Sequence, residues 1–533
     1  MEEQGKIYAG SAAKPKGRPW VYGQFSATVL PAACHLLATS SLRAAERSNP
    51  VKVRNNYPVN VGTVTLPALL TLYLAQVARA ISAMVNSNDG DRGVLVGRWD
   101  GEYSGGTEPF RWTGSVAILE QYMAAGGRPV RYGQCWVFAG LVTTICRALG
   151  LASRADTCYS SAHDTDSSLT IDKYYDQEGE ELTSAYGAPG IRDSIWNFHC
   201  WNDVWMTRPD LPPGYGGWQT IDSTPQEQSD RRFRLGPAPV TAVRNGEVGL
   251  GYDTAFVFTE VNADVVVYVR DPSSSWGFRR TDKNTRHIGQ LLLTKAVGGF
   301  SDDPKTEDWE DITALYKRKE GTKEERRAVE NALSGCGPCT TSEVDPGATS
   351  GREDVVMEVK DLSTGEYGKP YKVSVFLQNK ARAPRTVRVV LSSHSAFYTG
   401  TKAHLVKRGE GEFTMQVGEQ ETLSMVVAPE AYMDKVVDMC LMKNSLLVTV
   451  AETGQSWSAE DDFVLEKPEL QLRLLDSQLR LGRAFRLELS FTNPLDVSLT
   501  DCVISVEAAQ LVRAREANYP TIGPGEKVGG FGF

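Results

Sequence analysis

The feature that most constrains the fold is a segment that occurs twice in the C-terminal part of the chain. Residues 371–379 (YKVSVFLQN) and, 114 residues further on, residues 485–493 (FRLELSFTN) share one alternation of apolar and polar residues. A period of two is typical of a strand that buries one face. Other such segments, for example residues 386–391 (TVRVVL), are separated by Gly, Pro and Asn turns. The repeat therefore predicts two related all-β sandwich modules.

A small, polar segment separates these modules from the rest of the chain. Residues 333–353 read SGCGPCTTSEVDPGATSGRED, which is typical of a linker or exposed loop. Helical and strand patterns are mixed before it, which predicts an α+β domain. We expect a first domain at 1–335, a linker at 336–353, a first β-barrel at 354–466 and a second at 467–533. The second barrel ends at GFGF after too few strands to close, so we expect it to be incomplete.

Charge and terminal sequence limit the class of partner and the compartment. The net charge of -9 offers no basic surface for a phosphate backbone, so nucleic acid is not expected as a partner, whereas cations such as calcium are. The nine cysteines are irregularly spaced, which favours a reducing compartment. The N-terminus MEEQGKIYAG lacks the features of a signal peptide. We expect a cytoplasmic protein, and the sequence leaves non-classical export open.

The most apolar stretch does not favour a membrane span. Residues 61–81 (VGTVTLPALLTLYLAQVARAI) are marginally long enough, but Pro67, Gln76 and Arg79 interrupt them.

A cysteine begins the clearest helical pattern of the chain. In RYGQCWVFAGLVTTICRALGL, a turn-like YGQ precedes Cys135, and apolar residues follow at helical spacing until Gly150. The free N–H groups and the dipole at a helix N-terminus stabilise a thiolate. This predicts a nucleophile at Cys135, although a free cysteine is more often simply buried.

A nucleophilic cysteine needs a base, and histidine can both take and return a proton near neutral pH. His199 lies in DSIWNFHCWNDVW, whose alternation predicts a strand, and the next predicted strand, WQTIDST, carries Asp222. An antiparallel pairing would place Asp222 beside His199, where it could hold the imidazole. By themselves, a His and an Asp on two strands are more often ordinary solvated residues.

Several segments now give the chain a family resemblance. In this order, YGQCWVFAG, SAHDTDSSLT, WNFHCWNDVW, RPDLPPGYGGW and STPQEQS resemble animal transglutaminases. The resemblance covers most of residues 5–335 and, more weakly, the β modules. It implies an α+β papain-like catalytic core followed by two all-β immunoglobulin-like barrel or sandwich domains, without the family's N-terminal β-sandwich. It also maps a catalytic triad onto Cys135, His199 and Asp222.

The resemblance implies a two-step acyl transfer. Cys135 would attack the carboxamide of a protein glutamine, and a protein lysine, polyamine or other primary amine would then open the thioester, with deamidation as the side reaction. Trp99 would join the Cys135 backbone N–H in an oxyanion hole, and Trp196 would face Trp99 across an apolar passage. Tyr398, in SAFYTG, resembles a barrel tyrosine that hydrogen-bonds the active cysteine in closed transglutaminases. The ordinary role of an aromatic residue in a β module is packing.

One loop has the spacing of a calcium site. SAHDTDSSLT places Asp164, Asp166 and Ser168 at every second position, which lets a loop wrap oxygen ligands around the cation. It lacks the Gly and terminal Glu of an EF-hand, and such a loop alone is more often a surface turn. The resemblance makes it a calcium site, completed by Thr170 and Asp193.

The resemblance implies two further calcium sites. The second consists of Asn262, Asp264, Thr285, Glu320 and Glu325. The third lies in the NSNDGD loop and consists of Ala83, Asn86, Asn88 and either Asp89 or Asp91, because one extra residue makes the register ambiguous.

Other interpretations stay open on the residues alone. A papain-like thiol hydrolase would use the same Cys, His and Asp, and a catalytically impaired scaffold would keep the fold without the activity. Cys336 and Cys339 (CGPC) resemble a thioredoxin pair, but they lie in a linker, so a labile loop disulfide is the alternative. Residues near 55–76 have no counterpart in the family pattern and are expected to form an atypical insert.

Overall fold

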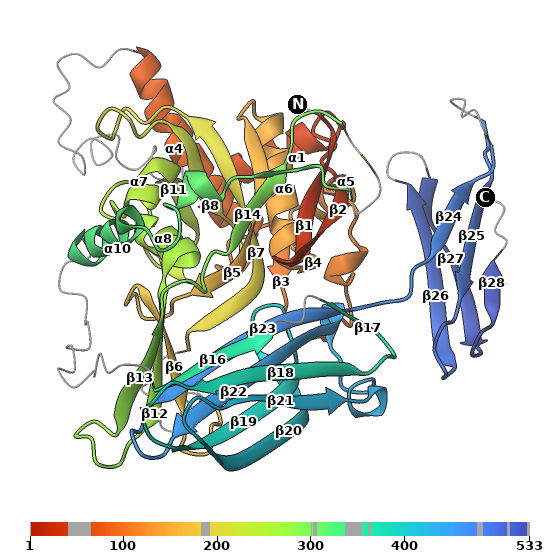
Figure 1. Ribbon diagram of the computed structural model, residues 1–533. Coiled ribbons are helices and arrows are strands. Elements are labelled where there is room, and N and C mark those ends of the chain that lie inside the picture. Colours follow the sequence, from red (N-terminus) through yellow and green to blue (C-terminus); the bar gives the residue numbers. More distant parts are fainter. Residues whose placement is uncertain are drawn as a thin grey trace.

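The structure is a computed structural model that describes residues 2–40, 66–182, 192–299, 301, 306–335, 354–360, 364–476, 483–508 and 512–529. Figure 1 shows a core of helices and strands up to residue 335, a first β module below it and a second β module to one side. The predicted fold class, an α+β core followed by two all-β domains, is confirmed. The predicted linker, with Cys336 and Cys339, and the first part of the predicted insert lie outside the described residues.

A six-stranded sheet organises the core. Its order is β11-β8-β7-β5-β14-β15, and every neighbouring pair is antiparallel. Most side chains of the long central strand β7 are buried, as expected for a strand covered on both faces. The strands are β5 (Ser153–His163), β7 (Ser194–Met206), β8 (Gly217–Asp222), β11 (Leu235–Pro239), β14 (Leu291–Lys295) and β15 (Trp309–Asp311).

Helix α6 (Cys135–Ala148) packs on β5 and β7 of this sheet. Its side chains are buried from Cys135 to Cys146, and Gly150 follows it with a φ of 84°, a left-handed conformation that suits a helix end. Helices α1 (Val29–Thr39) and α4 (Leu66–Val85) contact α6, and α5 (Val116–Ala124) contacts α1. Helix α4 includes the last part of the predicted insert. None of the described helices is long and apolar enough to cross a membrane.

Shorter elements surround this framework. Strands β1 and β2 form a hairpin, β3 and β4 pair in parallel ahead of α6, and β6, β12 and β13 form a separate sheet. The strands are β1 (Gln4–Ser11), β2 (Lys14–Val21), β3 (Leu95–Gly97), β4 (Val130–Gly133), β6 (Thr170–Tyr175), β9 (Gln228–Ser229), β10 (Arg232–Phe233), β12 (Asp264–Arg270) and β13 (Phe278–Asn284). The helices are α7 (Val240–Asn245), α8 (Thr254–Asn262), α9 (Thr313–Tyr316), α10 (Lys323–Gly335) and the 3-10 turn η2 (Pro109–Arg111).

The first β module consists of two sheets packed around one apolar core. Three strands form the sheet β16-β18-β21, and five form the sheet β17-β23-β22-β19-β20. The strands are β16 (Val355–Lys360), β17 (Thr364–Glu366), β18 (Tyr371–Asn379), β19 (Arg385–Ala396), β20 (Lys402–Met415), β21 (Gln420–Val427), β22 (Leu441–Val450) and β23 (Ser456–Glu466). Two 3-10 turns, η4 (Pro429–Ala431) and η5 (Asp438–Cys440), precede β22.

The second β module repeats the central strand of the first. Strand β25 (Leu487–Thr492) lies between β24 (Gln471–Leu474) and β28 (Lys527–Gly529), as β18 lies between β16 and β21. Strands β26 (Leu499–Ala508) and β27 (Val512–Ile522) form a hairpin. The Asn that ends each repeat donates from its amide to three backbone carbonyls: Asn379 to Ala383, Met415 and Gln416, and Asn493 to Val497, Ile522 and Gly523. The predicted repeat is therefore also a repeat of hydrogen bonds.

An ion cluster with two buried lysines, Lys173 and Lys443, joins the first β module to the core. The carboxylate of Glu181, in the core, forms ion pairs with Lys173 Nζ at 2.8 Å and with Lys402 Nζ of the β module at 2.8 Å. In the module, Lys443 pairs with Glu460 at 3.2 Å, and Lys173 reaches the same Glu460 at 3.9 Å. Because buried charges are tolerated only when they are paired, the cluster fixes how the module sits on the core.

Candidate active site

Cys135 is the first residue of α6, directly after β4. The preceding Gln134 is extended, and its amide donates to the Arg98 carbonyl and to the Tyr103 hydroxyl, both at 2.9 Å. These bonds hold the turn that presents the thiol at the helix N-terminus. The side chain of Cys135 is fully buried.

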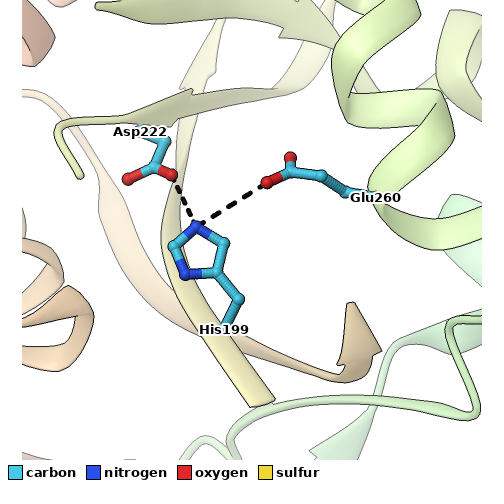
Figure 2. A group of neighbouring side chains, drawn as sticks. All are labelled: His199, Asp222 and Glu260. Carbon is cyan, nitrogen blue, oxygen red and sulfur yellow. Dashed lines mark hydrogen bonds and ion pairs between the residues drawn. The ribbon is translucent and has the colours of Figure 1, made fainter. Parts of the chain in front are cut away.

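His199 and Asp222 lie side by side, as the predicted pairing of β7 with β8 requires. His199 Nε2 is 2.6 Å from Asp222 Oδ2 (Figure 2). The Thr224 backbone N–H donates to Asp222 Oδ1 at 2.7 Å. The other ring nitrogen, Nδ1, has no oxygen or nitrogen partner in the described part of the chain, and the imidazole interacts with the Cys135 thiol. Nε2 thus faces the carboxylate while the ring also reaches the cysteine.

The charges of Cys135 and His199 depend on each other. Burial alone would raise the pKa of Cys135, but hydrogen bonding to Cys200 and to His199 lowers that pKa to about 6. Burial alone would lower the pKa of His199, but Asp222 and Cys135 raise it well above its ordinary value. These two shifts both favour a thiolate beside an imidazolium, which is the reactive form of a nucleophilic cysteine.

The hydroxyl oxygen of Tyr398 accepts two hydrogen bonds beside this pair. The Trp99 indole Nε1–H donates to it at 2.7 Å, and the Cys135 backbone N–H donates to it at 3.3 Å. Burial and the neighbouring Cys135 raise the pKa of Tyr398 well above its ordinary value, so the phenol stays protonated. Two donors therefore converge on one oxygen next to the thiol.

Aromatic rings hold Tyr398 in this position. The Tyr398 ring stacks on Phe198, with centroids 4.8 Å apart, and meets the Trp196 ring edge-on at 5.7 Å. Trp196 in turn lies 4.7 Å from the His199 ring, and Trp99 stacks on Phe138. Trp196 and Trp99 thus both contact Tyr398.

The loop that carries Tyr398 is seated on β7 of the core. The Asn197 backbone N–H donates to the Tyr398 carbonyl at 2.7 Å. Gly400 has a φ of 83°, and a Cβ there would lie 2.2 Å from the Ile195 carbonyl oxygen. Only glycine combines this conformation with so close an approach.

Three residues of this site were not predicted from the sequence. Glu260 Oε1, from α8, lies 3.7 Å from His199 Nε2, and Gln226 donates to Glu260 Oε1 at 2.9 Å. Burial is the main reason that the pKa of Glu260 rises to about 8. Cys200 shares hydrogen bonding with Cys135, as noted above. No local pattern marks Glu260, because its approach to His199 depends on how α8 packs on the sheet, whereas Gln226 lies in the STPQEQS segment just after β8.

The first predicted calcium loop does gather carboxylates. Asp164, Asp166 and Asp193 each place an oxygen within 4.8 Å of the others. Ser168 and Thr170 lie beside them, with their hydroxyl oxygens 3.1 Å apart. Burial, opposed by a backbone hydrogen bond and assisted by the neighbouring carboxylates, raises the pKa of Asp164 to about 7. Asp172, which was not predicted, accepts from Thr170 at 3.1 Å, and burial raises its pKa to about 6.

The second predicted calcium set is divided among basic side chains. Asp264 pairs with Arg326 at 2.7 Å and with Lys283 at 2.6 Å, while Glu325 also pairs with Arg326. Glu320 pairs with Lys317 at 2.7 Å. Asn262 ends α8 and is buried, and Thr285 follows β13. Within the described residues, no three His, Cys or acidic side chains of this set come within 4.8 Å of one another.

The third predicted set is held by hydrogen bonds to the β9-β10 region. Asn86 donates from its amide to the Phe233 carbonyl at 2.7 Å, and Asp89 accepts from the Phe233 N–H at 3.1 Å. Asp91 lies 3.5 Å from Arg232. Ala83 is buried in α4, and Asn88 follows that helix. Here too, among residues with described positions, no metal-sized group of carboxylates forms.

Two family models match parts of the chain. Residues 115–223 match the transglutaminase-like superfamily, and residues 355–459 match the C-terminal ig-like domain of the transglutaminase family. The first range holds Cys135, His199 and Asp222, and the second lies within the first β module.

Named relatives and a solved structure resemble the whole chain. It is 45% identical over 526 residues to the hemocyte protein-glutamine gamma-glutamyltransferase of Tachypleus tridentatus, covering 99% of this chain and 64% of the relative. It is 34% identical to the human protein-glutamine gamma-glutamyltransferase E, covering 99% of this chain and 72% of that protein. The crystal structure of red sea bream transglutaminase superposes with a TM-score of 0.79 at 31% identity, covering 99% and 72% of the two chains. The chain therefore spans about two thirds of the length of these relatives.

Proposed function

Because this chain belongs to the transglutaminase family, we propose that it is a calcium-dependent protein-glutamine gamma-glutamyltransferase, with Cys135, His199 and Asp222 as its catalytic triad. One observation carries the proposal: the Trp99 indole and the Cys135 N–H both donate to a single oxygen atom beside the thiol. Donors that converge in this way are what a tetrahedral oxyanion of acyl transfer needs.

The first half of the reaction acylates the cysteine. The Cys135 thiolate attacks the carboxamide carbon of a protein glutamine, and the resulting oxyanion takes the position of the Tyr398 hydroxyl oxygen, between Trp99 Nε1 and the Cys135 N–H. The His199 imidazolium gives its proton to the departing nitrogen. Ammonia leaves, and a thioester with Cys135 remains.

The second half transfers the acyl group to an amine. A lysine side chain, polyamine or other primary amine attacks the thioester carbonyl, and neutral His199 removes a proton from its nitrogen. Collapse breaks the carbon–sulfur bond, which releases an isopeptide and restores the Cys135 thiolate. The aromatic walls of Trp99 and Trp196 favour an uncharged amine over a charged one and restrict water, whose attack yields glutamate.

Tyr398 supports the proposal as a gate. Its hydroxyl fills the place of the oxyanion, and Cys135 is fully buried beneath it, so no glutamine side chain reaches the thiol in this conformation. The Tyr398 loop belongs to the first β module. Movement of this loop, alone or with its module, is therefore required before the first step.

The donor set around Asp164 fits calcium. Three carboxylates and two hydroxyls are hard oxygen ligands, and burial, assisted by the neighbouring carboxylates, raises the pKa of Asp164. Asp164, Asp166 and Asp193 would hold the ion with Ser168 and Thr170. Bound calcium would neutralise this cluster just ahead of β7, the strand that carries His199.

The other two predicted calcium sites require rearrangement. Arg326 and Lys283 would have to release Asp264, and the NSNDGD loop would have to turn its carboxylates toward one another. We assign calcium first to the Asp164 site, and we keep the other two sets as candidates.

The cysteines of the described part are free thiols, which supports our assignment to a reducing, cytoplasmic compartment.

Incorporation of a labelled primary amine into casein tests this function. We expect calcium-dependent incorporation that is lost in Cys135→Ala and in excess EGTA. Hydrolysis of the substrate without amine incorporation, as in the release of ammonia from glutamine side chains, would instead identify the alternative, a papain-like thiol hydrolase. An inactive chain with a normally folded core would identify a catalytically impaired scaffold.

A further inference from the structure

Two side chains outside the triad surround the carboxylate side of His199. Glu260 comes from α8 and Gln226 from the loop after β8, so two separate elements deliver them to one ring nitrogen. Figure 2 shows Asp222 and Glu260 both directed at His199 Nε2. His199, Asp222 and Glu260 are all almost completely buried. The two-step reaction described above gives Glu260 and Gln226 no role.

The amide nitrogen of Gln226 bridges the carboxyl groups of Asp222 and Glu260. Its nitrogen lies 3.1 Å from Asp222 Oδ2 and 2.9 Å from Glu260 Oε1, and also 3.0 Å from His199 Nε2. Since His199 Nε2 already donates to Asp222 at 2.6 Å, the two amide hydrogens go to one oxygen of Asp222 and one of Glu260. We assign the amide in this orientation, because in the reverse one its oxygen would face the Asp222 carboxylate oxygen.

We propose that Gln226 and Glu260 are positioning residues that fix His199 for transfer of protons to and from Cys135 and the substrates. The proposal rests on the proposed function and deepens it. Gln226 holds the Asp222 carboxylate against Nε2, and Glu260 holds Gln226. The ring nitrogen Nδ1, which has no oxygen or nitrogen partner among the described residues, is thereby kept for the thiol and the reacting groups.

The burial of Glu260 argues that this arrangement has a function beyond stability. Its second oxygen, Oε2, is buried and has no hydrogen-bond partner in the described part of the chain. A buried acceptor without a partner lowers stability, so an apolar residue would be the more stable choice at this position on α8. A role at His199 explains why the carboxyl group of Glu260 is kept 3.7 Å from Nε2 despite this loss of stability.

The test compares Gln226→Ala, Glu260→Ala and the conservative Glu260→Gln with the parent chain. Glu247→Gln is the matched control, because Glu247 is a core glutamate whose partners are Tyr215 and Asn245. Each variant is measured for kcat and KM with a glutamine peptide and labelled amine, and for the pH dependence of Cys135 alkylation by iodoacetamide. The urea midpoint of unfolding shows which variants are folded.

We expect both alanine variants to lose about tenfold in kcat while KM for the peptide stays within about twofold, as for a group that acts through a general acid–base. The pH midpoint of alkylation should rise by about one pH unit, since a loosened imidazolium stabilises the thiolate less. In Glu260→Gln, kcat and the pH midpoint of alkylation should both stay close to those of the parent chain, because the side-chain oxygen of Gln still accepts a hydrogen bond from Gln226. The double alanine variant should be no worse than either single one, since the two residues act as one unit.

Unchanged alkylation profiles and unchanged kcat in the folded alanine variants would overturn the proposal. So would a Glu260→Gln variant that behaves like Glu260→Ala. The alkylation measurement does not depend on acyl transfer. If the parent chain incorporates no amine, the proposed function fails, and the pH profiles still decide whether Gln226 and Glu260 position His199.

Discussion

The Tyr398 hydroxyl accepts a hydrogen bond from the Trp99 indole at 2.7 Å, across the boundary between the first β module and the core. This single bond joins the proposed gate to the proposed oxyanion hole. While Trp99 donates to Tyr398, its indole N–H is not available to an oxyanion. Docking of the β module and catalysis therefore compete for the same hydrogen-bond donor.

Replacing Tyr398 with Phe should make Cys135 more reactive. The variant leaves the Trp99 N–H and the Cys135 N–H without their acceptor in the closed conformation, and an unpaired buried donor costs about 1–3 kcal/mol. We expect iodoacetamide to alkylate Cys135 roughly ten times faster. Tyr371→Phe is the control, because Tyr371 is a buried tyrosine of the same module that bonds Ser393. Equal alkylation rates in the parent chain and Tyr398→Phe would exclude the gate.

Replacing Gly400 with Ala should displace the Tyr398 loop without changing a residue that contacts Cys135. The new Cβ would lie 2.2 Å from the Ile195 carbonyl oxygen, so the loop can no longer rest on β7. Gly418→Ala is a close control, since its φ of 78° imposes similar backbone strain and no atom lies within 4 Å of its Cβ position. We expect faster alkylation of Cys135 in Gly400→Ala alone. If both variants match the parent, the contact with Ile195 does not hold the gate.

The reactivity of Cys135 should follow a pKa near 6. Because the pKa of this thiol is lowered, its thiolate is present above about pH 6 and is lost as the pH falls below that value. Alkylation should therefore be nearly constant above about pH 7 and fall about tenfold per pH unit below pH 6. In His199→Asn the midpoint should move to higher pH, since the imidazolium no longer favours the thiolate. His404→Asn, an exposed histidine, should leave it in place. A His199→Asn midpoint that stays near 6 would contradict the ion pair.

The ion cluster that joins the first β module to the core should raise the free energy of unfolding. Lys443 is buried between Glu460 and Asp462, and removing one partner of a buried pair costs about 3–5 kcal/mol. We expect Lys443→Ala to lower the free energy of unfolding in urea by that amount. Arg388→Ala removes an exposed pair with Glu410 and should cost about 0–1 kcal/mol. Similar losses in the two variants would show that the cluster is not specially stabilising.

Local sequence patterns predicted those elements of the site that are formed by residues close together in the chain. The apolar spacing after Cys135 predicted the helix that α6 forms, and the alternation around His199 predicted β7. The pairing of β7 with β8 followed because the two strands are adjacent in the chain. The roles of Trp99, Trp196 and Tyr398 came only from the family resemblance.

Long-range packing decided what the sequence did not predict. Glu260 reaches His199 because α8 packs against β5 of the sheet, whereas Gln226 lies only four residues after Asp222. The second predicted calcium set came from the family resemblance, and nothing in the sequence showed that Arg326 would pair with Asp264 and Glu325. In the Asp164 set, the spacing of Asp164, Asp166 and Ser168 is local in the chain, whereas Asp193 came from the family resemblance.

Capture of the thioester on Cys135 tests the central claim most directly. The protein is mixed with a glutamine peptide and calcium without amine, quenched in acid, digested and analysed by mass spectrometry. We predict a fragment containing Cys135 that carries the peptide less one ammonia, that is cleaved by hydroxylamine and that is absent from Cys135→Ala. Amine incorporation without any acyl group on Cys135, or incorporation that persists in Cys135→Ala, would contradict the account.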